Sequence, residues 1–274
     1  MSAKKQAGVG QRFNQLLDDD NRQAQALLAS SEWLEEEPVH QFRLCIKRLR
    51  AGWRMVRSPD YCAYRQAADP LLKAAAQTLG GKRDADVRLA TWHRLRAGTG
   101  DIQTSHLDSL EALLQTEATA PAVTVEREAL LALLRREAAI RADAQLARCR
   151  WRELKQGRQR AVKKNRQLAE QALKGQVDET FHRWRRWAKH LLYQRQLAAS
   201  SRGRTLGERQ QLLKQLGSEL GRKHDLDMLA AFLAQSIRRP KQRVALEAIR
   251  PLVDATNRRH IAIIRDLYTR FIDE

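Results

Sequence analysis

The stretch that most constrains the fold of this chain runs from Val39 to Arg54, where charged residues recur with a helical period. At about 100° per residue, an α-helix places five cationic or ionisable side chains within an arc of roughly 80°. Apolar side chains fill a neighbouring arc, which is typical of a helix that packs one face against a core. The charged arc consists of His40, Arg43, Lys47, Arg50 and Arg54, and the apolar arc of Phe42, Ile46, Leu49 and Trp53.

Five such side chains held side by side repel one another, so an anion that they normally meet is the best explanation for their arrangement. The whole chain has the same bias, because 51 Lys and Arg residues against 32 Asp and Glu residues give a formal charge of +19. Nucleic acid, anionic lipid and a chain of phosphates are all suitable partners. Composition does not choose among the three.

The other segments also have the helical period, and none shows sustained alternation of polar and apolar residues. With 274 residues and 43% hydrophobic content, the chain is long enough to bury a core. The pattern therefore predicts an all-α fold in which amphipathic helices bury one another's apolar faces. One long helix is expected over residues 124–155, with helix breaks at Gly157 and Gly221.

Cysteine content and hydropathy predict the cellular setting. Cys45, Cys62 and Cys149 are odd in number and lack the spacing of a metal site, so we expect reduced thiols. No window approaches the roughly 20 apolar residues of a membrane span, and residues 1–15 lack the apolar run of a signal peptide. We expect a soluble, cytoplasmic protein with no membrane partner.

Two motifs occur twice, in the same order. His40-x-x-Arg43-x-x-x-Lys47 recurs as His182-x-x-Arg185-x-x-x-Lys189, at an offset of 142 residues. The segment 79–86, LGGKRDAD, recurs as LGRKHDLD at 220–227, at an offset of 141 residues. This spacing predicts two internal repeats, about 10–140 and about 150–274, within one domain over 10–274.

The duplication predicts two tandem antiparallel four-helix bundles related by internal pseudo-two-fold symmetry. We call the charged arc of residues 40–54, and its counterpart after His182, the two basic stripes, and we expect both to face one groove. The second stripe is weaker. Leu192 and Gln196 stand where the first copy has Arg50 and Arg54. We therefore expect Arg50 and Arg54 to contribute more to binding than any residue at the equivalent positions of the second copy.

The motif pair HxxRxxxK and LGxxRDxD, present twice in a helical chain, resembles the CHAD family over about residues 10–273. The resemblance implies two four-helix bundles with a basic central groove that binds inorganic polyphosphate, often at polyphosphate granules. It carries the polyphosphate contact onto His40, Arg43, Lys47 and Arg50, and onto His182, Arg185, Arg186 and Lys189. The sequence departs from the family pattern at Leu192, where Arg is usual, and at His224, where Asn is common.

The predicted polyphosphate-binding set also includes basic residues of the stripe and of the second motif. Arginine supplies forked donors to phosphate oxygens, lysine a point charge, and histidine a donor whose charge increases beside an anion. The added residues are Arg54, Lys82, Arg83, Lys223 and His224. We expect no cofactor, no metal and no catalytic residue in this set.

Four aspartates of the second motif are predicted to cap helix starts or to orient the basic side chains. They are Asp84, Asp86, Asp225 and Asp227. A nucleic-acid binder that uses the same positive charge is the main alternative. A metal-dependent phosphohydrolase that uses His40, His182, His224 and nearby carboxylates is a further alternative. The position of the first copy that corresponds to His224 is Arg83, and arginine does not bind a metal ion at neutral pH, which argues against this alternative.

Overall fold

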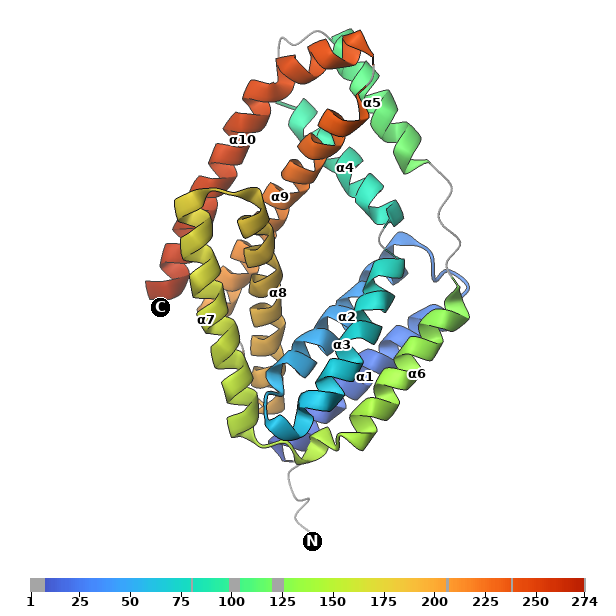
Figure 1. Cartoon of the computed structure of the whole chain (residues 1–274), viewed down its shortest axis with the longest axis vertical. Helices are drawn as coiled ribbons and strands as arrows, with labels where there is room; N and C mark the ends of the chain where they lie inside the picture. The colour runs from blue at the N-terminus through green and yellow to red at the C-terminus, as the bar shows by residue number, and fades with distance from the viewer. Residues whose placement is uncertain are drawn as a thin grey trace. The chain divides into compact units, whose positions relative to one another are not determined.

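The computed structural model describes residues 8–79, 81–98, 104–119, 126–205, 207–237 and 239–273. Within these ranges the ordered elements are all helices and no strand occurs, which confirms the predicted all-α fold (Figure 1). In chain order they are α1 (Val9–Ala29), α2 (Glu36–Met55), η1 (Pro59–Tyr61), α3 (Cys62–Thr78), α4 (Gly81–Arg96), α5 (Thr104–Ala118), α6 (Arg127–Asp143), η2 (Leu146–Arg148), α7 (Trp151–Gly175), α8 (Asp178–Ser201), α9 (Glu208–Ser236) and α10 (Pro240–Asp273).

The chain forms two compact units, each assembled from segments that alternate along the sequence. The first unit takes Met1–Leu79, Val125–Gln167 and Arg186–Gln210. The second takes Gly80–Thr124, Leu168–Arg185 and Gln211–Glu274. Both α7 and α8 therefore contribute one part to each unit. The repeat boundaries inferred from the motifs, and the two-fold relation between the repeats, stay predictions.

Four helices of the first unit form a bundle, because α1 and α3 each pack against both α2 and α6. Their apolar faces meet in one core that includes Phe13, Leu17, Phe42, Ile46 and Trp53, all at most 1% exposed. The α2 helix passes close to α1 at Gly52, where a Cβ would lie 2.5 Å from Leu17 Cδ2. The predicted apolar arc of α2 is thus the face that enters this core.

A buried carboxylate connects three of these helices. Glu137 of α6 is fully buried and accepts hydrogen bonds from Asn21 Nδ2 at 2.6 Å and Trp53 Nε1 at 2.7 Å. Its charged partner is Arg141, whose Nε lies 3.2 Å from Glu137 Oε1 and which also pairs with Asp18. Because a buried charge needs such partners, this network fixes the register of α1, α2 and α6.

The second unit has its own core, to which α4, α5, α9 and α10 all contribute. Trp92 of α4, Leu110 of α5, Leu229 of α9 and Ile249 of α10 are at most 1% exposed and belong to one apolar cluster. Trp184 of α8 is also fully buried, and its ring packs edge-on against Tyr268 of α10 with the centroids 5.3 Å apart. The sequence places Trp53, Trp184 and Trp187 on or near the apolar faces of their helices, which predicts core packing. Trp53 and Trp184 are fully buried, whereas Trp187 is only half-buried.

Two predicted helix breaks are wrong. The helix expected over 124–155 ends at Asp143, and Gln145 takes a left-handed conformation with φ 49°. Helix α7 then continues through Gly157, where a Cβ would lie 2.1 Å from Met55 O. Helix α9 likewise continues through Gly221. Glycine at position 157 permits close helix packing and does not end a helix.

The three cysteines are free thiols, as the sequence predicts. In the described ranges, no helix combines the length and the apolar character needed to cross a bilayer.

Candidate functional site

The basic stripe lies on α2, and the local sequence explains why the helix forms there. Glu36 and Glu37 occupy its first turn, where carboxylates complement the helix dipole, and Pro38 follows within the first turn, where proline is tolerated. Arg54 lies in the last turn, where a cation is favoured. The core contacts of Phe42 and Ile46 direct the stripe away from the apolar interior.

Arg43, one of the predicted binding residues, also holds the end of a neighbouring helix. Its Nη1 donates to the carbonyl oxygen of Leu79 at 2.8 Å and lies 3.5 Å from that of Ala76, at the C-terminal end of α3. These carbonyls have no partner within an α-helix, so a guanidinium is a suitable cap. The sequence pattern alone did not predict this structural role.

Arg50 and Arg54 share one carboxylate, Asp69 of α3. Arg50 Nε lies 3.0 Å from Asp69 Oδ1, and Arg54 Nη2 lies 3.6 Å from Asp69 Oδ2. Burial acts to raise the pKa of Asp69, but the hydrogen bond from Arg50 and the charges of both arginines outweigh it and hold the pKa below its usual value. Asp69 is therefore ionised at neutral pH and neutralises only one of the two positive charges.

His190 of α8 joins this group, although it was not among the predicted site residues. Arg54 Nη1 lies 2.9 Å from His190 Nε2, and Arg54 Cζ lies 6.0 Å from the ring centroid of Trp187. Burial, with the charges of Arg54 and Arg50, lowers the pKa of His190 to about 3. The imidazole is thus neutral, Nε2 accepts from Arg54, and the proton resides on Nδ1, which is buried without a hydrogen-bond partner among the described residues.

Arg186, one turn before His190, is exposed and adds positive charge to the same place. Its charge contributes to lowering the pKa of both Arg54 and His190, after burial and closer charges. We call Arg50, Arg54, Asp69, Arg186 and His190 the Arg54 cluster. It brings together three of the predicted binding residues, two from α2 and one from α8, around a single acid.

In the second unit, the structure brings together two more predicted residues. His182 Nδ1 of α8 lies 3.1 Å from His224 Nδ1 of α9, and the ring centroids are 4.4 Å apart. One nitrogen must donate and the other accept, so at most one of the two Nδ1 atoms carries a proton. In the described parts of the chain, no group of three or more His, Cys, Asp or Glu side chains is arranged to hold a metal ion.

Lys223 differs from its predicted role. It is fully buried, and its Nζ lies 2.7 Å from Asp178 Oδ1, 2.8 Å from Asp227 Oδ2 and 4.7 Å from the ring centroid of Phe181. A lysine in this position is neutralised within the protein and offers no exposed charge to a polyanion. Burial raises the pKa of Asp227, against the lowering effect of Lys223.

Only one copy of the duplicated motif places an aspartate in the first turn of a helix. Asp84 lies in the first turn of α4, as expected for a capping carboxylate. Asp225 and Asp227 instead lie in the interior of α9, because that helix begins at Glu208. Their predicted position at a helix start is therefore wrong, and Asp227 pairs with Lys223.

The remaining predicted residues are placed as follows. Lys82 and Arg83 lie in the first turn of α4, but their side chains are outside the described part of the structure. His40 is exposed, and Lys47, Arg185 and Lys189 are half-buried. Asp86 lies in the second turn of α4. The single groove lined by both repeats stays a prediction.

Comparison with known protein families identifies the family of this chain. Residues 15–234 match the family described as CHAD domain. The chain belongs to the CHAD domain family. The basic stripe, His182, Arg185 and the paired histidines all lie within the matched residues.

Solved structures support the fold of this CHAD domain. It is similar to PptA from Streptomyces chartreusis, with a TM-score of 0.66, 17% sequence identity and coverage of 97% of this chain and 99% of that chain. It is also similar to the CHAD domain from the plant Ricinus communis, with a TM-score of 0.61, 20% identity and coverage of 96% and 94%. No curated protein matches the chain.

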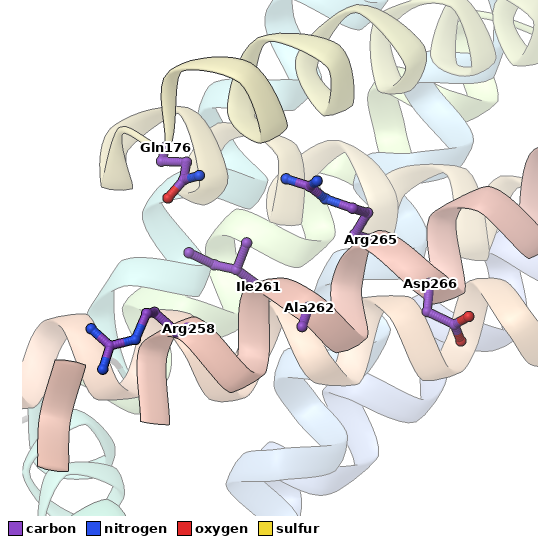
Figure 2. A pocket seen from close by; sticks show the side chains of 6 residues that line it. All are labelled: Gln176, Arg258, Ile261, Ala262, Arg265 and Asp266. Carbon is purple, nitrogen blue, oxygen red and sulfur yellow. The ribbon is translucent and has the colours of Figure 1, made fainter. Parts of the chain in front are cut away.

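A pocket of about 480 Å³ lies elsewhere in the CHAD domain, in the second unit (Figure 2). Ile261 and Ala262 of α10 lie between two arginines of the same helix in this view. None of the predicted site residues lines it. Its lining residues are Gln176, Arg258, Ile261, Ala262, Arg265 and Asp266.

Proposed function

We propose that this CHAD domain binds inorganic polyphosphate through the basic residues of α2, α8 and α9. The observation that carries the proposal is the Arg54 cluster, in which Arg50 and Arg54 share one carboxylate beside a neutral histidine, and Arg186 adds a third positive charge. An excess of positive charge on partly buried side chains suits a ligand with closely spaced negative charges and no bases. The family resemblance supports the same ligand.

The proposal assigns a separate contribution to each unit. In the first unit, Lys47, Arg50, Arg54 and Arg186 supply charge, and Arg54 is oriented by His190 and Asp69. In the second unit, His182, His224 and Arg185 supply donors. Association with polyphosphate granules is part of this proposal.

A double substitution tests the proposal. Lys47→Gln with Arg186→Gln removes two charges from the α2 and α8 faces and spares Arg43, which also holds the end of α3. We expect polyphosphate affinity to decrease about tenfold at low salt, or about 0.7 kcal/mol for each charge. Arg135→Gln with Arg136→Gln is the matched control, since both arginines are exposed on α6.

Equal loss of affinity in the two double variants would contradict the proposal, because binding would then depend on net charge alone. Competition identifies the ligand class. RNA or DNA at the same concentration of phosphate should not displace bound polyphosphate. Displacement would favour the nucleic-acid alternative.

A further inference from the structure

Two arginines pack against Trp151 in the first unit, and neither belongs to the Arg54 cluster. Trp151 is the first residue of α7. The guanidinium carbon Cζ of Arg202 lies 4.6 Å from the centroid of its ring, and that of Arg158 lies 5.6 Å from it. Arg195 of α8 adds a third guanidinium, whose charge interacts with that of Arg158. We call these four residues the Trp151 cluster.

The cluster lies on a different side of α8 from the predicted site. At about 100° per residue, Arg195 lies roughly 160° around the helix from the side that carries Arg186 and His190. Arg202 follows the last residue of α8. A ligand at the Trp151 cluster therefore contacts a surface that the stripe of α2 does not form.

The positive charges of the cluster are not neutralised within the described chain. Arg158, Arg195 and Arg202 form no ion pair with any carboxylate of the described residues, and Arg195 Nε donates to the neutral amide of Gln210 at 3.0 Å. The acid in the first turn of α7, Glu153, is buried and accepts a hydrogen bond from the backbone nitrogen of Arg150 at 2.8 Å.

The lowered pKa values of two of these arginines also indicate positive charges that lack a neutralising partner. Burial lowers the pKa of Arg158, and the charge of Arg202 lowers it further. Burial also lowers the pKa of Arg195, followed by the charges of Arg209 and Arg158. The charged forms thus repel one another in the ligand-free protein, and a bound anion would relieve that repulsion.

Packing on tryptophan does not account for the whole cluster. A cation over an indole ring is favourable, which explains one guanidinium on the ring of Trp151. The negative end of the α8 dipole favours a cation at Arg202. Neither effect explains why the charges of Arg158, Arg195 and Arg202 interact with one another without an acid to neutralise them.

We propose that the Trp151 cluster is a second binding site for phosphate oxyanions. Forked guanidinium donors match the oxygens of a phosphate group. Two guanidiniums already lie over the indole ring, so the site suits inorganic phosphate chains and not a stacked nucleotide base. This choice of ligand class rests on the proposed function, whereas the site itself rests on the arginines around Trp151.

Fluorine NMR of the full chain labelled with 5-fluorotryptophan tests the proposal, because each site has its own reporter. Trp151 reports on the second site, and Trp187, next to Arg54, reports on the first. The two resonances are assigned with Trp151→Phe and Trp187→Phe, and tripolyphosphate is the probe. We expect both resonances to shift on titration.

Substitutions separate the two sites. Arg195→Gln with Arg202→Gln should abolish the ligand-induced shift of Trp151 and leave that of Trp187, whereas Lys47→Gln with Arg186→Gln should do the reverse. The control pair Arg135→Gln and Arg136→Gln should change neither. A Trp151 resonance that stays fixed while Trp187 shifts would overturn the second site and leave the proposed function intact. A shift of Trp151 alone would support the second site and contradict the first, and silence at both would refute both.

Discussion

Arg54 Nη1 lies 2.9 Å from Nε2 of His190, a residue 136 positions away in the sequence. The contact requires a neutral imidazole, because two positive charges at that distance repel strongly. It joins the last turn of α2 to the part of α8 that belongs to the same compact unit. The contact therefore orients the Arg54 guanidinium before any ligand binds.

The stability of the protein should decrease in acid because of His190. The pKa of His190 decreases on folding from its usual 6.5 to about 3. As the pH falls through this window, the unfolded chain binds a proton that the folded chain does not, so the free energy of unfolding decreases by up to about 1.4 kcal/mol per pH unit. Denaturant titrations at a series of pH values measure this slope.

His190→Gln should make that slope shallower, because the amide oxygen introduced there still accepts from Arg54 but does not titrate. The difference in unfolding free energy between the two proteins should change between pH 6.5 and pH 3 and stay constant above pH 7. Parallel stability profiles would show that His190 titrates normally in the folded protein.

Asp69 should limit polyphosphate affinity, because its carboxylate occupies Arg50 and Arg54. Asp69→Asn should increase the affinity about fivefold, which corresponds to about 1 kcal/mol. Asp143→Asn removes the same charge from an exposed position at the end of α6 and is the control. Calorimetric titration measures both, and an equal gain in the two variants would indicate a general effect of net charge.

Lys223 should contribute to stability and not to binding. Lys223→Met leaves the carboxylate of Asp227 partly buried without its cation, at a cost of about 3–5 kcal/mol. Lys223→Met combined with Asp227→Leu should recover much of that loss. Chemical denaturation gives the stabilities, and calorimetry gives the affinity of the folded proteins. Normal stability with weakened polyphosphate binding would instead support a direct contact from Lys223.

Two glycines should respond in opposite ways to alanine. Gly157→Ala places a Cβ 2.1 Å from the backbone oxygen of Met55, so we expect a loss of about 3 kcal/mol. Gly217→Ala, in the interior of α9, meets no atom within 4 Å and should gain about 0.5–1 kcal/mol of helix stability. Thermal unfolding compares them. A tolerated Gly157→Ala would mean that α7 and Met55 are further apart.

The sequence was sufficient to predict the helical fold and the side of α2 that carries charge. Both follow from local periodicity, since Phe42 and Ile46 recur with the helical period beside the basic arc. The breaks predicted at Gly157 and Gly221 were wrong because a glycine inside a helix looks the same in sequence as one that ends a helix. At Gly157, the close approach of the Met55 backbone shows that the glycine permits packing within a continuous helix.

The candidate site was predicted less completely, for a similar reason. The helical period identified Arg50 and Arg54 but not their partners, because Asp69 and His190 come from other helices and lie outside the periodic arc of α2. The motif also included Lys223, whose burial depends on Asp178 and Phe181 of another helix. Contacts between helices, and not periodicity within one, decide which cations are available to a ligand.

The affinity for phosphate chains of increasing length tests the central claim most directly. Orthophosphate, tripolyphosphate and long-chain polyphosphate are titrated calorimetrically into the protein at several salt concentrations. A multivalent basic surface predicts that affinity increases with chain length, and that the affinity for the long chain decreases most steeply with salt as more counterions are released. Equal affinity for orthophosphate and the long chain would contradict the account.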